Sequence, residues 1–261
     1  MTGTRTTGRR TARSVVVAAA LASLPACTPA GDAGSPSPEA LRAVQRATAR
    51  AGSARVETTT VVGGELSLKA TGALGWGDGL TGTLTITYTG GTAADTMRRL
   101  GTTSLEARYL PDAYYARMGD AFAARAGGRH WIEYVYADLE ESGDGAGAGF
   151  AEQMRATTPD ETVRQLLASG EVREVGEETT HGRRTTHWSA TVGGDTARTV
   201  DIWVDDRDLL VKKAERGRTK TGELSQTAHY SDYGLPVVAE RPPAADTADF
   251  RELLETPGSR P

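Results

Sequence analysis

The chain has 261 residues, a formal net charge of −4 and a single cysteine, Cys27. A negatively charged chain has no general electrostatic attraction to nucleic acid, so a nucleic-acid partner is not expected. One cysteine excludes an intramolecular disulfide and a metal centre built from several thiolates.

Residues 1–26 have the pattern of a secretory signal peptide. Four arginines and no acidic residue precede an apolar run that ends at Leu24. The run is about ten residues long, whereas a membrane-spanning helix needs about 20. The sequence Leu24-Pro25-Ala26-Cys27 then resembles the lipobox of bacterial lipoproteins, whose cysteine thiol receives diacylglycerol and becomes the first residue of the mature protein.

The lipobox resemblance implies that Cys27 is lipidated. Its acyl chains would anchor the protein to the extracellular face of the cell membrane rather than span the membrane. An ordinary signal peptide, cleaved after an Ala-x-Ala site with Cys27 incidental, is the alternative. Cleavage before Cys27 would leave 26 Lys and Arg against 34 Asp and Glu, a net charge of −8.

The sequence after the signal divides into a tether and a domain. Residues 27–38 are small, polar and rich in proline, which is typical of a flexible tether after the lipidated cysteine. Residues 39–261 have a length that fits a single domain.

The first predicted element is an amphipathic helix from Pro38 to Ala51. Its apolar residues recur at helical spacing, and Gly52 follows it. The period then changes to two in segments 65–76 and 80–88, which indicates two strands joined by a Gly-Asp-Gly turn. The apolar residues that alternate with polar ones in these strands include Leu66, Leu68, Leu84, Ile86 and Tyr88.

Eight more strands and two more helices complete the prediction. The helices are expected at 159–169 and 246–255. Strands with one polar face belong to antiparallel sheets, and a sheet this wide must curl. The predicted fold class is therefore α+β: a strongly curved antiparallel sheet of about ten strands, a half-barrel, with helices covering its concave face. The further strands are expected at 98–109, 112–118, 129–136, 171–180, 184–193, 197–205, 209–217 and 222–232.

No motif predicts catalysis, a cofactor or a metal site. The glycine-rich segment 143–149 follows acidic residues, which repel phosphate. The aspartates of residues 205–208 suit a tight turn better than a calcium loop. Neither a Gly-x-Ser-x-Gly nor a Ser-x-x-Lys motif occurs. The chain is therefore not expected to be an enzyme, and a hydrolase stays as a remote alternative. The four histidines lack the spacing of metal ligands: His130, His181, His187 and His229.

The apolar strand face is the remaining candidate site. It is either a core beneath the helices or the lining of a cavity for an apolar ligand, and periodicity does not separate the two. The residues that we expect to line or border such a cavity are Leu66, Leu68, Leu84, Ile86, Tyr88, Trp203 and Leu210.

The second half of the chain carries an ordered series of short motifs. VGEE at 175–178 precedes THW at 186–188, which VDIWVD at 200–205 and YSDYG at 230–234 follow. This series resembles the actinobacterial LppX/LprG-type lipoproteins, whose fold is similar to that of the lipoprotein carrier LolA. The resemblance implies an open half-barrel that holds an acyl lipid or glycolipid on its concave face, as a carrier or sensor. A ligand-free envelope protein that binds a protein partner is the alternative.

Overall fold

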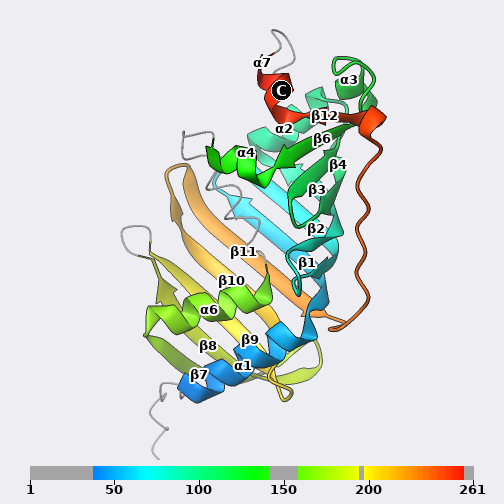
Figure 1. The fold of residues 1–261 in the computed structure, drawn as a ribbon. Coiled ribbons are helices and arrows are strands. Elements are labelled where there is room, and N and C mark those ends of the chain that lie inside the picture. The colour runs from blue at the N-terminus through cyan, green and yellow to red at the C-terminus, as the bar shows by residue number, and fades with distance from the viewer. Residues whose placement is uncertain (1–37, 142–157, 194–196, 256–261) are drawn as a thin grey trace, which may run out of the picture. The chain divides into compact units, whose positions relative to one another are not determined.

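The computed structural model describes residues 38–141, 158–193 and 197–255 (Figure 1). The expected signal peptide and tether and the glycine-rich segment 143–149 lie outside these ranges. The described residues are of the α+β class, with twelve strands in a single sheet and helices against it. The predicted fold class is confirmed, although the sheet has two strands more than expected.

The sheet is built from two antiparallel meanders. Pairing between β1 and β11 joins them, and the short β12 adds to β6 in parallel, at the far edge. The strand order is β12-β6-β5-β4-β3-β2-β1-β11-β10-β9-β8-β7. The first meander comprises β1 (Ser53–Val62), β2 (Leu66–Gly75), β3 (Thr81–Gly90), β4 (Ser104–Tyr109), β5 (Ala113–Arg117) and β6 (Trp131–Val135). The second comprises β7 (Val172–Thr180), β8 (Arg183–Val192), β9 (Arg198–Asp205), β10 (Leu210–Thr219) and β11 (Gly222–Ser231), and β12 spans Thr247–Asp249.

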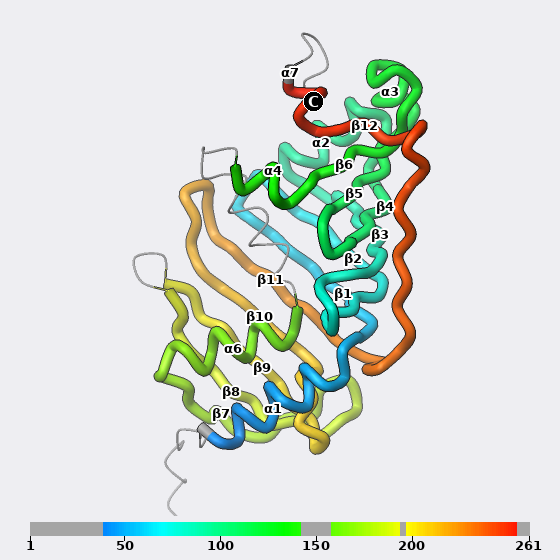
Figure 2. Tube along the Cα trace, viewed as in Figure 1, coloured from blue at the N-terminus to red at the C-terminus, as the bar shows by residue number. Residues whose placement is uncertain are grey.

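Two helices cross the concave side of the sheet. α1 (Pro38–Ala51) and α6 (Pro159–Ser169) lie side by side, and α6 packs on β7 and β8 (Figures 1 and 2). No helix in the described part of the chain is long and apolar enough to cross a membrane. The other helical elements lie toward the β2–β6 half of the sheet: α2 (Gly91–Arg99), α3 (Asp120–Ala123), α4 (Tyr136–Glu141), the 3-10 turn η1 (Ala244–Asp246) and α7 (Phe250–Glu255).

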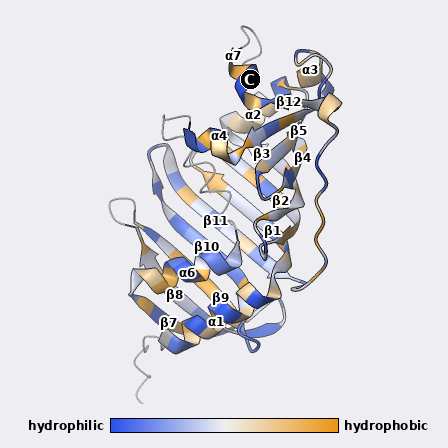
Figure 3. Cartoon of the chain, in the orientation of Figure 1, coloured by the Kyte–Doolittle hydropathy of each residue, from blue (hydrophilic) through white to orange (hydrophobic). Residues whose placement is uncertain are grey.

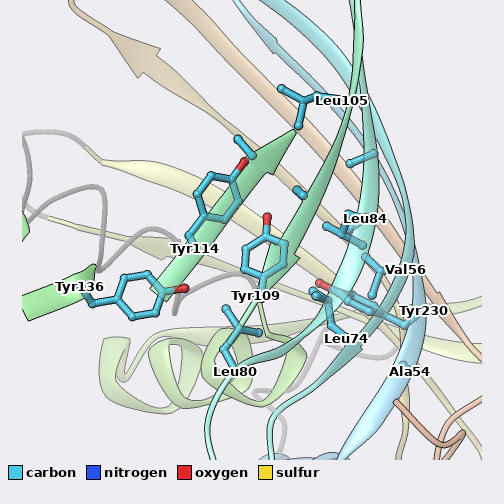
Figure 4. Close-up of a cluster of buried hydrophobic side chains, with 14 of the residues drawn as sticks. Ala54, Val56, Leu74, Leu80, Leu84, Leu105, Tyr109, Tyr114, Tyr136 and Tyr230 are labelled. Carbon is cyan, nitrogen blue, oxygen red and sulfur yellow. The ribbon is translucent and has the colours of Figure 1, made fainter. Parts of the chain in front are cut away.

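The main core lies between these helices and the sheet. Val44 of α1, Val163 and Leu166 of α6 and Ile202 of β9 are fully buried in one apolar cluster. The same cluster continues across β1 to β5, where Leu74, Leu84 and Tyr109 come together (Figure 4). Burying side chains of this size stabilises the fold by about 1.5–3 kcal/mol each.

All ten predicted strands overlap observed ones, and the errors have physical causes. β1 was missed because three successive threonines, residues 58–60, blur its alternation. The strand predicted from residue 98 begins only at Ser104, because α2 occupies the residues up to Arg99. The helix predicted at 246–255 begins at Phe250, because β12 comes first. Three residues are too few for a periodic signal.

Two glycines allow β2 and β3 to approach closely. Gly72 pairs with Leu84, and Gly82 pairs with Leu74, so each leucine lies beside the glycine of the other strand. A Cβ atom on Gly82 would lie 2.2 Å from the Ala73 carbonyl oxygen and 2.9 Å from Leu74 Cδ2. The φ angle of Gly82 is +147°, which side-chain-bearing residues rarely adopt.

Gly82→Ala should therefore destabilise the domain strongly. The added methyl group would meet the backbone of β2, which is paired with β1 as well as β3 and cannot shift alone. We expect a loss of about 3 kcal/mol in the free energy of unfolding, measured by urea denaturation. Gly77→Ala is the matched control, because a Cβ atom there has no neighbour within 4 Å. The control should change stability by no more than about 0.5 kcal/mol. Equal stability of the two variants would contradict the close approach of β2 and β3.

Candidate functional site

Cross-strand register sorts the strand residues onto two faces of the sheet. Leu84 of β3 shares a buried cluster with Val44 of α1 and Leu166 of α6, so its face is the concave one. Positions opposite Leu84 on neighbouring strands, and every second residue from them, belong to that face. The alternate positions form the outer face.

Five of the seven expected lining residues lie together on the concave face. Leu84 is 3% exposed and belongs to the core. The other four keep part of their apolar surface accessible, because they are only half-buried. These half-buried residues are Leu66 and Leu68 of β2 and Ile86 and Tyr88 of β3.

Trp203 departs from the expected set, because it lies on the outer face. Its ring stacks on His187 at 4.2 Å between ring centres, and the Lys212 ammonium lies 3.8 Å from the ring centre. Alternation could not show this, since residues on both faces of β9 are buried. Leu210 does share the cluster of the concave side, but it is fully buried and is therefore a core residue.

Aromatic rings gather on the concave face of β4 to β6. Tyr109 and Tyr114 lie side by side, 5.2 Å apart between ring centres (Figure 4). Tyr114 and Tyr134 are 5.6 Å apart. Tyr134 also packs on Phe250 of α7 at 4.6 Å. Burial raises the pKa of Tyr109 and Tyr114, and it raises the pKa of Tyr134 to about 12. All three phenols therefore stay uncharged at physiological pH.

A line of polar side chains crosses the concave face between its apolar regions. We call this line the polar lane. Each member faces inward by register, and hydrophilic residues recur here along β10 and β11 (Figure 3). The polar lane consists of Thr58 and Thr60 of β1, Gln226 of β11, Lys213 and Glu215 of β10, and Arg198 of β9.

The charged members of the polar lane form a chain of ion pairs. The Lys213 ammonium lies 3.1 Å from one oxygen of Glu215, and Arg198 Nε lies 2.8 Å from the other. Lys213 is 9% exposed, and the Glu215 side chain is 12% exposed. Removing such charges from water costs several kcal/mol per ion, so these charges are expensive to hold on the concave face.

The sequence did not predict the polar lane. The run Lys212-Lys213-Ala214-Glu215 has a polar residue at three of its four positions, and an amphipathic strand normally turns its charges outward. Here the irregular register between Leu210 and Lys212 sets the faces, and it directs Lys213 and Glu215 inward. No signal in a single sequence reveals that irregularity.

Three of the four histidines lie on the outer face, whereas His130 pairs with Asp246 at 2.8 Å beside β6. His187 lies between two carboxylates, with Nδ1 2.9 Å from Glu178 and Nε2 3.0 Å from Asp201. The ring of His181 lies 4.3 Å from that of His229. Within the described residues, no three His, Cys, Asp or Glu side chains are placed to hold a metal ion. These contacts tie the end of the β7–β8 hairpin to the outside of β9 and β11.

Comparison with known sequences gives two close relatives, whereas no family model matches the chain. A protein of Streptomyces coelicolor strain A3(2), SCO4650, whose name classes it among the lipoproteins, is 68% identical over 287 aligned positions. The alignment covers 99% of this chain and 100% of that protein. An uncharacterised 31.2 kDa protein of Streptomyces griseus, from the rplA–rplJ intergenic region, is 47% identical over 85% of this chain and 82% of its own length.

Several solved structures show a more distant similarity. Lipoprotein LppX of Mycobacterium tuberculosis is 17% identical with a TM-score of 0.49, over 78% of this chain and 100% of that one. LprF of Mycobacterium bovis is 15% identical with a TM-score of 0.47, over 80% and 99%. A chain of the Pseudomonas aeruginosa MucA/MucB complex is 13% identical with a TM-score of 0.36, over 80% of this chain and 59% of that one. The strand order of this chain by itself defines its fold.

The outer-face histidines predict one pH effect on stability. Burial lowers the pKa of His229, and His181 and Lys212 lower it further, against an opposing effect of Glu57. The folded protein therefore binds the proton less readily than the unfolded chain, whose histidine pKa is about 6.5. The free energy of unfolding should be unaffected by His229 above that pH and should fall as the pH is lowered through the folded pKa.

His229→Gln should remove this contribution. We expect a shallower loss of stability between pH 7.5 and pH 5 than in the wild type, measured by urea denaturation at each pH. His181→Gln removes only the neighbouring ring and should give part of the effect. Superimposable pH profiles of the wild type and His229→Gln would show that His229 is equally basic in both states.

Proposed function

Because this chain belongs to the family of the Streptomyces coelicolor lipoprotein SCO4650, we propose that Cys27 carries its lipid anchor. The lipobox-like sequence Leu24-Pro25-Ala26-Cys27 supports this assignment. Export with a diacylglyceryl cysteine leaves the protein attached to the extracellular face of the cell membrane. With Cys27 as the first mature residue, residues 1–26 are the signal peptide, 27–38 the tether and 39–261 the domain.

Cys27→Ala tests the anchor. The variant has no thiol to lipidate, so the exported protein should move from the membrane fraction to the culture medium, measured by immunoblotting of both fractions. Thr28→Ala changes the next residue and keeps the thiol, and it should remain with the membrane. A Cys27→Ala protein that had lost residues 1–26 and still stayed membrane-bound after a high-salt wash would exclude lipidation at Cys27 as the anchor.

The domain, on this proposal, binds the acyl chains of a lipid on its concave face, as a carrier or a sensor. The observation that supports it is the group of half-buried apolar residues Leu66, Leu68, Ile86 and Tyr88, which share that face. Covering such side chains with hydrocarbon is favourable by about 0.8 kcal/mol per buried CH₂ group. Binding of this kind needs no catalytic group.

Native mass spectrometry of the full chain carrying Cys27→Ala, purified from a streptomycete, tests the lipid-binding proposal. We expect excess mass that organic solvent extracts as acyl lipid. Ile86→Trp should reduce the lipid-bound fraction several-fold, because the larger ring fills space on the concave face. Thr85→Trp is the control, since Thr85 is exposed on the outer face of the same strand.

Two results would oppose lipid binding. Protein free of lipid from that host would favour the alternative of an envelope protein that binds a protein partner. Equal lipid occupancy in Ile86→Trp and Thr85→Trp would place the ligand away from β3.

A further inference from the structure

The polar lane divides the concave face into two apolar regions. On one side lie Leu68, Ile86 and Tyr88 of β2 and β3. On the other side Val200 and Ile202 of β9 are buried near α6. Register places Glu215 in one cross-strand row with Gln226, Thr60, Leu68 and Tyr88. The β9 side is filled core, so an amphiphile whose chains cover the half-buried residues of β2 and β3 would place its polar part against the polar lane.

Lys213 and Gln226 of the polar lane have hydrogen-bond donors without a partner among the described residues. Each Glu215 oxygen already lies beside a cation, Arg198 or Lys213. An ammonium has three N–H donors, and one partner of Lys213, the Glu215 carboxylate, is seen within the described residues. Gln226 gives one amide hydrogen to Thr60 at 3.2 Å and has a second to offer. A site rich in donors suits a group rich in acceptors.

The net charge of the polar lane also favours an anionic ligand. Lys213 and Arg198 carry two positive charges, against the one negative charge of Glu215. Asp160 of α6 acts electrostatically on Tyr230, as Glu215 does, and it pairs with Arg164 of its own helix at 3.2 Å. The side chain of Lys213 is 11% exposed, so most of it lies away from water. An anion beside it would form a charge-assisted hydrogen bond in surroundings of low polarity.

We infer that the polar lane binds the anionic headgroup of an acidic phospholipid, with the phosphate at Lys213 and the acyl chains on the half-buried apolar residues of β2 and β3. This inference rests on the proposed lipid binding and narrows it to one class of ligand. A neutral diacylglycerol with the same chains would cover the same apolar surface, but it would bring no second anion to Lys213 beside Glu215.

The test compares three probes on the full chain carrying Cys27→Ala, after its lipid has been extracted. The probes are phosphatidylglycerol, diacylglycerol with identical acyl chains, and inorganic phosphate, each titrated by native mass spectrometry. Phosphatidylglycerol should bind about tenfold more tightly than diacylglycerol, as expected for one buried charge-assisted contact. Phosphate alone should bind far more weakly than either lipid.

Lys213→Met should remove the preference for phosphatidylglycerol and leave diacylglycerol binding unchanged. Because this variant leaves Glu215 with one cation fewer, a double variant, Lys213→Met/Glu215→Gln, removes both charges together and keeps the fold. Lys69→Met is the matched control, because it removes a lysine from the exposed outer face of β2. It should bind all three probes as the parent does.

The outcomes separate this inference from the function on which it rests. Binding of neither lipid would overturn both. If the two lipids bound equally, or if the preference survived Lys213→Met, the inferred recognition of an anionic headgroup at Lys213 would be wrong. The proposed lipid binding would still stand. Phosphate that binds as tightly as phosphatidylglycerol would show a site for a free anion, which would also overturn the inference.

Discussion

The double pairing of β1 is the interaction on which the rest of the structure depends. β1 is in register with β2 from Ser53 to Val62 and with β11 from Arg55 to Val62. Without it, each meander would expose a long edge with unpaired backbone groups, which is a template for aggregation. The pairing of Arg55 with Ser231 closes most of the chain into a loop, and such a contact is entropically costly. It is therefore expected to form late in folding, after each meander has formed from its local hairpins.

The β1–β11 pairing also fixes what the concave face contains. It aligns Thr58 with Ala228 and Thr60 with Gln226, and through them with Lys213 and Glu215. A slip of one residue in any of these strands would move its inward side chains to the outer face. The polar lane is therefore a consequence of register over several strands. The ion pair between Arg198 of β9 and Glu215 of β10 also opposes slippage, because a shift between these two strands would separate the two side chains.

The faces of a strand could be predicted from the sequence only where polar and apolar residues alternate clearly along it. β2 and β3 alternate clearly, and their inward residues Leu66, Leu68, Leu84, Ile86 and Tyr88 were placed together correctly. β9 is buried on both faces, so its alternation could not assign Trp203 to either one. The inward direction of Lys213 depends on irregular pairing between β10 and β9, which is a property of two strands. A single sequence shows the pattern of each strand but not the partner that sets its faces.

The two parts of the concave face would contribute differently to recognition on the proposed function. Apolar contact scales with the buried area of the chains, so Leu68 and Ile86 would retain lipids without distinguishing one headgroup from another. Lys213 and Glu215 are held by backbone register and by each other, so their geometry is set before a ligand arrives. A site that leaves a buried cation poorly paired disfavours every occupant that lacks an anion, and this penalty gives selectivity. On this proposal, the stability that the polar lane costs the empty domain would be the source of its discrimination among lipids with identical chains.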